Sequence, residues 1–396
     1  MPLGLYISVP FCRTKCTFCN FASDVFSRAV FDRYIDRVRS DMERSREMAS
    51  KADGIVHQPV DSIYLGGGTP TLLDSTQLER LFVTIRQNFD LQFNAEITVE
   101  CAPGTLTPTV IDSLIRCGVN RVSLGAQSFI NKESAAVGRL HNRDTIIDDT
   151  GRLRSAGISN INIDLIAGLP HQTAESWEES LSEVIASGVP HASVYMLEVD
   201  EESRLGREVI AGGTKYHAHF VPDDELTADM YEHACGRLNA AGIQQYEISN
   251  FAREGFESQH NLKYWTRQPY LGFGVDAHSM LLTSNDGVEA IRLANPDSLE
   301  RFVAVSDAVL TPVSRQEALE EEFFLGLRLV RGVDLLDLAE KFGADAISGF
   351  SEVINDFVTD GLMERQGNFI TLTPRGRLLS NEVFAGFIVV SVSNVS

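Results

Sequence analysis

The stretch LYISVPFCRTKCTFC, residues 5–19, decides the fold of this 396-residue chain. Its first five residues are mostly apolar or β-branched, which predicts a short buried strand over 5–9. Three cysteines follow directly, Cys12, Cys16 and Cys19, with the spacing CxxxCxxC. Since thiolates are soft metal ligands, a strand that ends in such a loop predicts a metal centre at the end of a sheet.

Two kinds of metal centre can use these cysteines. A [4Fe–4S] cluster held by three thiolates leaves its fourth iron open to a small molecule. A structural zinc site is the alternative, but it takes four ligands, and no fourth Cys or His lies at motif spacing. The pattern therefore favours a [4Fe–4S] cluster. The remaining cysteines, scattered along the chain and expected to be small buried side chains, are Cys101, Cys117 and Cys235.

Outward from this loop, short apolar runs alternate with amphipathic helical patterns over the first two thirds of the chain. The expected strands are 5–9, 62–65, 96–100, 121–125, 160–165 and 192–197. The expected helices are 28–48, 75–88, 107–117, 142–156 and 174–187. This alternation predicts an α/β fold with a parallel sheet, as an incomplete (β/α) barrel or a doubly wound sheet. No GxGxxG turn follows a strand, which disfavours the dinucleotide-binding version.

The pattern changes at about residue 296. Helices are expected over 317–329, 335–342 and 346–359, followed by a hairpin of strands 362–365 and 369–372. Three helices and a hairpin resemble a small winged-helix-like α+β module. Its helices are acidic, so a DNA-reading role is not expected. We therefore expect two domains, residues 1–295 and 296–396.

Charge and hydropathy narrow the classes of function. The formal net charge is −21, from 55 acidic and 34 basic residues, which disfavours a nucleic-acid partner because phosphates would be repelled. No apolar run approaches the roughly 18 residues that suggest a membrane span. The first residues lack the basic and cleavage-site features of a secretory signal, so a cytoplasmic location is expected.

Further sequence signals indicate a ligand pocket at the carboxyl ends of the strands. The segment GGGTP, residues 66–70, ends the second strand with backbone that a ligand can approach closely, although a tight turn would also explain it. Glu100, Gln127 and Asp164 terminate or follow later strands, where an unpartnered buried polar group is costly. Arg139 follows and could pair with a carboxylate. Because the carboxyl ends of parallel strands share one rim, these residues predict a polar ligand there.

Several longer motifs carry a family resemblance. They are ECAPG at 100–104, GVNRVSLGAQSF at 118–129, GRLH at 138–141, NIDLIAGLP at 162–170, YEISNFA at 246–252 and YLGFG at 270–274. Together with the cysteine loop and GGGTP, they resemble the radical S-adenosylmethionine (SAM) superfamily, and within it the family of oxygen-independent coproporphyrinogen III oxidases and HemW-type haem chaperones. The resemblance implies an incomplete parallel (β/α)6-type radical SAM barrel.

The resemblance also implies residue roles. The amino and carboxylate groups of SAM would chelate the open iron, with Glu100 and the glycine edge at its amino-acid part and Asp164 at a ribose hydroxyl or nearby polar group. The positions that match the family's SAM site are Tyr6, Phe18, Gly67, Gly68, Thr69, Glu100, Gln127, Arg139 and Asp164.

Two departures separate the oxidase from the chaperone within this family. The oxidase pattern has a fourth cysteine where this chain has Phe21, and it has an N-terminal extension where this chain has eleven residues before Cys12. HNLKYW, residues 260–265, is similar to the HNxxYW motif associated with haem binding in HemW-type proteins. This implies that His260, Tyr264 and Trp265 contact haem, with His260 a plausible axial ligand. Structural packing of His260 and Trp265 is the alternative.

The resemblance therefore implies a haem chaperone that binds a [4Fe–4S] cluster, SAM and haem, and delivers haem to respiratory haem proteins. Peripheral association with a membrane would be compatible with such recipients, and coproporphyrinogen oxidase activity is not expected. Two alternatives stay open: an oxygen-independent coproporphyrinogen III oxidase acting by a SAM-derived radical, and a radical SAM enzyme that modifies tRNA. The acidic charge disfavours the second.

Overall fold

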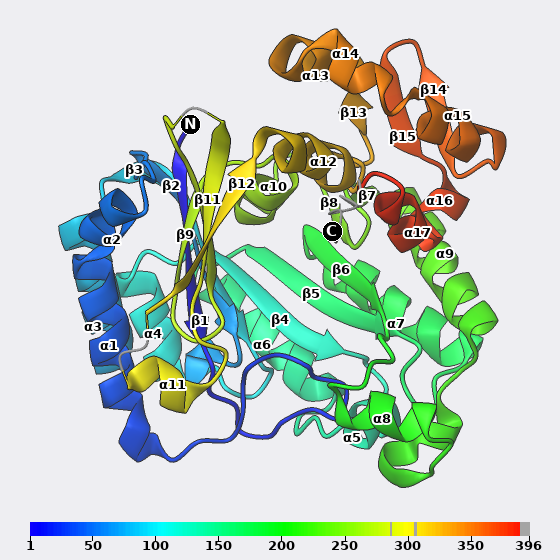
Figure 1. Cartoon of the computed structure of the whole chain (residues 1–396). Coiled ribbons are helices and arrows are strands. Elements are labelled where there is room, and N and C mark those ends of the chain that lie inside the picture. Colours follow the sequence, from blue (N-terminus) through cyan, green and yellow to red (C-terminus); the bar gives the residue numbers. More distant parts are fainter. Residues whose placement is uncertain (286, 305–306, 389–396) are drawn as a thin grey trace.

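The computed structural model describes residues 1–285, 287–304 and 307–388, and its largest feature is a twelve-stranded sheet. The strand order is β12-β11-β10-β9-β1-β2-β3-β4-β5-β6-β8-β7. Figure 1 shows the sheet curving around an interior, with helices on its outside. None of the described helices has the length and apolar content needed to cross a membrane.

The centre of the sheet consists of parallel strands that follow one another along the chain, as predicted. They are β1 (Leu3–Val9), β2 (Val60–Gly67), β3 (Leu91–Cys101), β4 (Arg121–Gln127), β5 (Asn160–Ala167) and β6 (His191–Met196). Their pairing is in register across the interior, with Tyr6 beside Tyr64 and Tyr64 beside Thr98. Burial on both faces explains why these strands are nearly continuous apolar runs.

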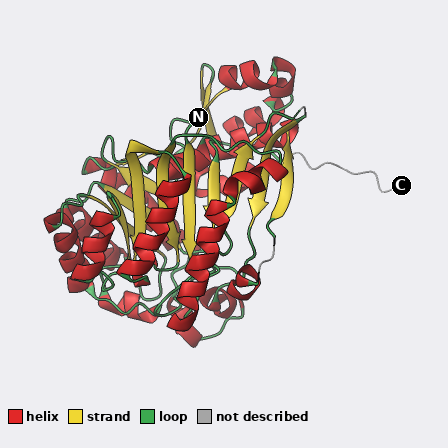
Figure 2. Ribbon diagram, turned by 90° about the vertical axis from the view of Figure 1, so that its left-hand side faces the viewer, coloured by secondary structure: helices red, strands yellow, loops and turns green. Residues whose placement is uncertain are grey.

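Helices pack on the outer face of the parallel strands, and Figure 2 shows them lying across it. They are α1 (Phe31–Glu43), α2 (Ser45–Lys51), α3 (Ser75–Asn88), α4 (Pro108–Arg116), α5 (Asn131–Ala136), α6 (Arg143–Ser155), α7 (Ala174–Ser187) and α9 (Asp224–Ala240). Their ends carry recognisable signals. A capping box of Asp74 and Gln77 begins α3, and Gly188, in the left-handed region at φ 66°, ends α7.

The first predicted helix, 28–48, is corrected by the structure. A single 3-10 turn, η1 (Arg28–Val30), comes first, and the chain breaks again between α1 and α2 at Arg44. The Ser45 hydroxyl donates to the Met42 carbonyl at 2.8 Å, a local hydrogen bond that competes with the helical pattern.

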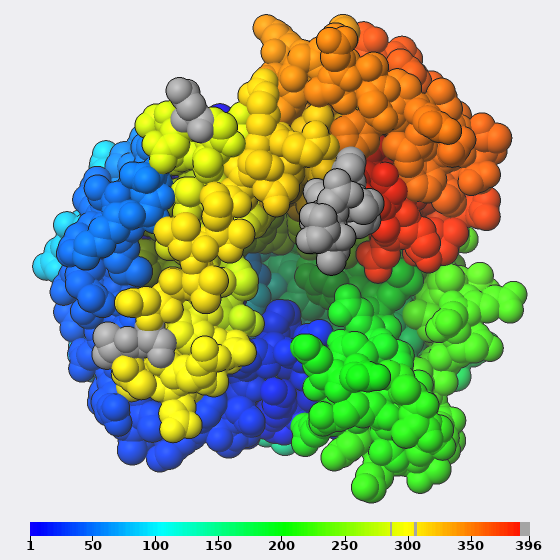
Figure 3. Space-filling view, in the orientation of Figure 1, coloured from blue at the N-terminus to red at the C-terminus, as the bar shows by residue number. Residues whose placement is uncertain are grey.

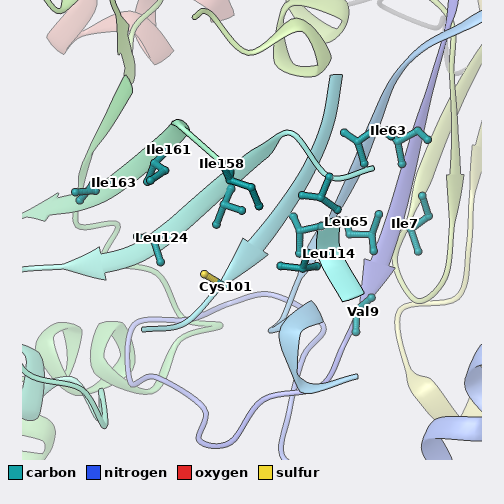
Figure 4. Packing of buried hydrophobic residues seen from close by; sticks show 14 of the residues in the cluster. Ile7, Val9, Ile63, Leu65, Cys101, Leu114, Leu124, Ile158, Ile161 and Ile163 are labelled. Atoms are coloured by element: carbon teal, nitrogen blue, oxygen red, sulfur yellow. The ribbon is translucent and has the colours of Figure 1, made fainter. Parts of the chain in front are cut away.

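The main hydrophobic core lies between the parallel strands and the outer helices. Figure 4 shows the side chains of Val9, Leu65, Leu124 and Ile163 pointing into this layer, with Cys101 among them. Cys101 is 3% exposed, and Cys117 is 2% exposed, so both are buried as expected. Cys235 is half-buried and packs against the core.

Further strands extend the sheet at both edges. On one side β9 (Tyr270–Phe273) runs parallel to β1, and antiparallel strands β10 (His278–Leu282), β11 (Val288–Ala294) and β12 (Val309–Ser314) follow. On the other side lie β8 (Asn250–Ala252) and β7 (Gln244–Gln245). The connecting elements are α8 (Arg204–Ile210), the 3-10 turn η3 (Lys215–Phe220), α10 (Gln259–Trp265) and α11 (Leu299–Val303).

The C-terminal module has its own small core and sheet. Its helices are α12 (Arg315–Gly326), α13 (Leu335–Phe342), α14 (Ala344–Ser348), α15 (Ser351–Thr359), α16 (Pro374–Leu378) and α17 (Ser380–Ala385). The predicted hairpin, β14 (Met363–Gln366) and β15 (Phe369–Leu372), gains a third strand, β13 (Val333–Asp334), beside β15. The predicted helix 346–359 is two helices, because the chain turns at Gly349 and Phe350 and buries the Phe350 ring against Phe323.

The large sheet continues through β12 to Ser314, beyond residue 296 where we expected the second domain to begin. The division into residues 1–295 and 296–396 stays a prediction. Residues 305–306 and 389–396 of the second range lie outside the described residues.

Candidate functional site

The cysteine loop follows β1 and is anchored to distant parts of the chain. Cys12 N donates to the Asp24 carbonyl at 2.9 Å, and Thr17 N donates to the Val137 carbonyl at 3.1 Å. Leu205 N, in α8, donates back to the Thr17 carbonyl at 2.8 Å. These backbone contacts hold the loop over the carboxyl ends of the strands.

All three loop cysteines line one cavity at this end of the barrel. The Arg139 Nη1 atom lies 3.4 Å from Cys16 Sγ. Burial raises the pKa of Cys12 and of Cys19, so both thiols are protonated at neutral pH in the metal-free chain. Binding to iron would deprotonate them, and the arginine would stabilise the resulting negative charge.

The donor set fits an iron–sulfur cluster. Three thiol groups without disulfide partners line one cavity from one short loop, and thiolates are the ligands that such clusters use. No three His, Cys, Asp or Glu side chains within the described ranges form a group that could hold a single metal ion. A tetrahedral zinc ion would need its sulfurs within about 4 Å of one another, whereas a cubane cluster spaces its thiolates more widely.

The glycine segment after β2 is needed because the cysteine loop packs against it. A Cβ atom on Gly68 would lie 2.6 Å from the Val9 carbonyl oxygen and 2.8 Å from that of Phe11. Gly68 N donates to Val9 O at 2.9 Å, and Thr69 N donates to Phe11 O at 2.8 Å. We expected this backbone to admit a ligand, and it also admits the metal-binding loop itself. Gly67, at φ +95°, adopts a conformation that favours glycine.

Glu100 lies deep in the cavity at the end of β3. Tyr64 Oη donates to its Oε1 at 2.8 Å, and Gly67 N donates to its Oε2 at 3.1 Å. Burial raises the pKa of Glu100 to about 7, and the negative charge of Asp164 adds to this shift. Glu100 is therefore poised to ionise when a cation binds beside it.

Asp164 and Gln127 complete the polar rim that the sequence predicted. The Asp164 carboxylate accepts hydrogen bonds from Asn162 Nδ2 at 2.7 Å and Ser123 Oγ at 3.2 Å, and burial raises its pKa. Gln127 has a positive φ of 68°, and its Oε1 is buried without a hydrogen-bond partner in the described chain. Two carboxylates and an unsatisfied amide suit a cationic ligand with further polar groups, as SAM has.

The structure brings most of the predicted SAM-site residues together. The predicted residues that line the cavity, of about 1000 Å³, are Cys12, Cys16, Phe18, Cys19, Gly67, Gly68, Thr69, Glu100, Gln127, Arg139 and Asp164. Tyr6 does not line it. Its ring lies inside the barrel, with its centroid 6.2 Å from that of Tyr64 and 6.4 Å from that of His260.

The cavity also has walls that the sequence analysis missed. Tyr195 and Met196 end β6, so the same strand-end rule that led to Asp164 could have found them. Other walls come from α9 and from the C-terminal module, which no local sequence signal could have placed there. Figure 3 shows the hollow between the barrel and this module. The residues of α9 and of the C-terminal module that line the cavity are Asp224, Thr227, Arg328, Arg375, Leu378, Leu379, Ser380 and Asn381.

The HNLKYW segment lies at the other end of the barrel, in and around α10, and does not line the cavity. His260 is fully buried. Its Nδ1 lies 3.0 Å from Ser62 Oγ and its Nε2 lies 2.8 Å from Tyr264 Oη, so both ring nitrogens have hydrogen-bond partners. The guanidinium of Arg328 lies over the Trp265 ring, and its central carbon is 4.3 Å from the ring centroid. In this arrangement α10 packs between the barrel and the C-terminal module.

Comparison with known proteins supports the architecture. The sequence profile of the radical SAM superfamily matches residues 6–184, and that of the HemN C-terminal domain matches residues 313–379. The solved structure of coproporphyrinogen III oxidase (HemN) from Escherichia coli, described as a radical SAM enzyme, superposes with a TM-score of 0.81 at 25% identity. That match covers 98% of this chain and 90% of the oxidase. The predicted radical SAM barrel is therefore confirmed.

Curated relatives match over nearly the whole chain. Heme chaperone HemW of Bacillus subtilis (strain 168) is 33% identical, covering 97% of this chain and 98% of the relative. Heme chaperone HemW of Escherichia coli (strain K12) is 30% identical and covers 98% of each chain. These matches extend through both the cysteine loop and the C-terminal module.

Proposed function

Since this chain belongs to the HemW family of haem chaperones, whose curated members match it over nearly their full length, we propose that it binds haem as cargo and delivers it to haem proteins. The proposal places it in the cytoplasm, with respiratory haem proteins as recipients. Peripheral contact with a membrane is compatible with this role.

The proposal includes a [4Fe–4S] cluster on Cys12, Cys16 and Cys19. The observation that supports it most is that these thiols and the Glu100 carboxylate line one cavity. When bound, the cluster supplies an open iron that chelates SAM and can pass it an electron. Arg139 beside Cys16 would stabilise the thiolates.

The SAM site proposed here uses charge and shape. Glu100 and Asp164 would hold the cationic groups of SAM, because ionised carboxylates beside a cation form strong hydrogen bonds. Gly67, Gly68 and Thr69 would hold it against the strand end, while Phe18 shields the site from water. Phe18 packs on a small apolar cluster that includes Ile166, which fixes its ring.

For haem itself, His260, Tyr264 and Trp265 stay the predicted contacts. As an axial ligand, His260 would have to give up one of its two hydrogen bonds and leave a fully buried position. A spectral comparison of wild type and His260→Ala tests this directly, because losing an iron–imidazole bond changes the Soret band.

A second candidate function is coproporphyrinogen III oxidation, which the structural likeness to the Escherichia coli oxidase favours. Against it stands Phe21, 62% exposed on the cysteine loop, at the position of the oxidase's fourth cysteine.

Anaerobic reconstitution with iron, sulfide and SAM separates the two candidates. The reconstituted protein is titrated with haem, and in parallel incubated with coproporphyrinogen III and a reductant. Stoichiometric haem binding without protoporphyrinogen formation supports the chaperone. Protoporphyrinogen formation would make the protein an oxidase, and failure to bind haem would overturn the proposed function.

A further inference from the structure

The C-terminal module contributes two arginines to the cavity. Arg328 follows α12, and Arg375 lies in α16, and both line the same cavity as the cysteine loop. In the views of Figures 1 and 3, α16 and α17 lie across the hollow from the cysteine loop. The apolar side chains of Leu378 and Leu379 line the cavity beside them.

Two aromatic rings hold the Arg328 side chain in place, and at least one of its N–H donors has no partner among the described residues. Its guanidinium lies 4.3 Å from the ring centroid of Trp265 and 5.9 Å from that of Phe384, which fixes it by cation–π contacts. Its Nε is buried and has no hydrogen-bond partner among the described residues. A guanidinium has five N–H donors, and Arg328 lines the cavity, so its remaining N–H groups suit an anion there.

The nearest acidic group, Glu247, forms a long ion pair with Arg328. Glu247 Oε2 lies 4.0 Å from Arg328 Nη2, beyond hydrogen-bond distance. Glu247 is fully buried, and burial raises its pKa while the charge of Arg328 opposes that shift. Glu247 also accepts a hydrogen bond from Asn250 Nδ2, so its other oxygen is already committed.

Arg375 is the more exposed of the two arginines. It is exposed, and one of its nitrogens, Nη1, donates to the Asp360 carbonyl at 2.8 Å. The other N–H groups of its fork can reach a carboxylate, which guanidinium binds in two-point fashion. In a chain with net charge −21, both of these arginines line the cavity and bring positive charge to it.

We propose that Arg328 and Arg375 form a carboxylate subsite for the propionates of haem, with the macrocycle lying against Leu378, Leu379 and Ile248. This inference rests on the proposed function. Glu100 and Asp164, at the strand ends, attract cationic SAM, whereas the two arginines of the C-terminal module attract propionates. Haem is flat and apolar with anionic carboxylates, which is the combination this wall complements.

This placement of haem departs from the direct contacts that the HNLKYW resemblance implies, because His260, Tyr264 and Trp265 do not line the cavity, and it gives Trp265 a role without contact to the ligand. The Trp265 ring lies under the guanidinium of Arg328. Trp265 is therefore a positioning residue for the carboxylate subsite. A motif at the far end of the barrel interior would in this way affect haem binding through the C-terminal module.

The test removes each partner of the proposed contact in turn, the propionate charges of haem and the arginines of the protein. Full-length reconstituted protein is titrated with haem and with haem dimethyl ester, whose propionates are capped. Wild type should bind haem about tenfold or more tightly than the ester. The double variant Arg328→Gln, Arg375→Gln should lose this preference and bind both with the affinity that wild type has for the ester.

Controls separate the subsite from general damage. Arg365→Gln removes an exposed arginine of the same module that does not line the cavity, and it should keep the wild-type preference. Iron content and SAM affinity report an intact barrel in every variant. Because Arg328 also packs on Trp265, Arg375→Gln alone, at an exposed position, should still reduce the preference if Arg328→Gln fails to fold.

The role of Trp265 is tested by the same measurement, the affinity for haem relative to the affinity for its dimethyl ester. Trp265→Leu should reduce it, Trp265→Phe should retain part of it, and Trp265→Leu should have no further effect in the Arg328→Gln background. A wild type that binds haem and ester equally, or arginine variants that keep full preference, would overturn the subsite while leaving the chaperone proposal intact. A wild type that binds neither ligand would instead overturn the proposed function.

Discussion

The two ends of the barrel interior use similar polar side chains in opposite ways. At the amino ends of the strands, Glu96 accepts backbone hydrogen bonds from Gln259 and His260 at 3.1 Å, and His260 itself has two further partners. At the carboxyl ends, the cysteine thiols and Glu100 face a cavity of about 1000 Å³. Glu96 and His260 have their partners within the chain and do not line this cavity, whereas Glu100 and the thiols also face a space that a ligand can enter.

This difference teaches how to tell a structural polar residue from a ligand-binding one. A buried group whose hydrogen-bonding capacity is filled by the chain contributes mainly to stability. A group that is buried and also faces a cavity, with a shifted pKa, is a candidate for ligand binding. If the comparison is right, substitutions at one end should change binding and substitutions at the other should change the free energy of unfolding.

The largest effect is expected at the cysteine loop. Cys12→Ser, Cys16→Ser or Cys19→Ser should each abolish the cluster or nearly so, because each removes one of three thiolates. Iron and sulfide content after anaerobic reconstitution measures this. Cys117→Ser, at a buried cysteine that does not line the cavity, is the matched control and should keep the cluster. A cluster that survives the loop substitutions but is lost in the control variant would overturn the assignment of the loop cysteines as ligands.

The next effect is expected at the opposite end, on stability. His260→Ala should lower the free energy of unfolding by about 3 kcal/mol, because it leaves a cavity and removes the partners of Ser62 and Tyr264. SAM affinity and cluster content should stay near wild type. Denaturant unfolding measures the loss, and the exposed His219→Ala is the control.

The pH dependence of this loss has a definite sign. Burial lowers the pKa of His260 to about 3, below its ordinary 6.5, so the unfolded chain binds a proton there that the folded chain does not. Wild type should therefore lose stability as pH falls from about 6.5 toward about 3, by up to about 1.4 kcal/mol per pH unit from this group. His260→Ala should lack that contribution, and an identical slope in both proteins would contradict it.

A smaller effect is expected for Glu100, on SAM binding. Glu100→Gln should weaken SAM binding by about 2 kcal/mol, since it removes a charge-assisted hydrogen bond. With a pKa raised to about 7, Glu100 is protonated in the ligand-free protein below that pH. Wild-type affinity should therefore fall about tenfold per pH unit below pH 7, whereas the variant should be nearly flat there. Calorimetry at several pH values checks both statements.

The smallest effect is expected at Tyr64, which lies between the two ends. Its hydroxyl donates to Glu100, and its ring stacks on His260 with centroids 5.5 Å apart. Tyr64→Phe should weaken SAM binding by about 1 kcal/mol and shift its pH midpoint upward, because the lost hydrogen bond no longer lowers the Glu100 pKa. Stability should change little, since the ring remains. A loss of free energy of unfolding larger than the loss of SAM-binding free energy would contradict the assignment of Tyr64 to the ligand-binding end.

Local patterns predicted much of the fold and part of the site. The helices over Ser75–Asn88 and Ala174–Ser187 were predicted at their observed bounds, because their caps and apolar periodicity lie in the segments themselves. The strand-end rule correctly placed Glu100 and Asp164 in one cavity. The helix break at Arg44 was missed, because no Gly, Pro or other helix-ending residue in the sequence marks it.

What could not be predicted depends on contacts between distant segments. Arg328 and Arg375 reach the cavity only because the C-terminal module packs over the barrel, and nothing in their local sequence indicates this. The partners of His260 likewise come in part from Ser62, 198 positions away. A motif can identify such a histidine, but only the fold shows whether its nitrogens are free.

The place of β1 in the sheet has a consequence for the making of the protein. β1 lies between β2 and β9, so one of its neighbours is about 250 residues further along the chain than Cys19. A ribosome adds about 5–20 residues per second, so the cysteines wait roughly 12–50 s after synthesis before that neighbour exists. Over that interval the nascent chain presents reduced thiols beside an open strand edge. Cluster insertion is therefore expected to follow translation, and factors that guard new thiols and strand edges would set the yield of loaded protein.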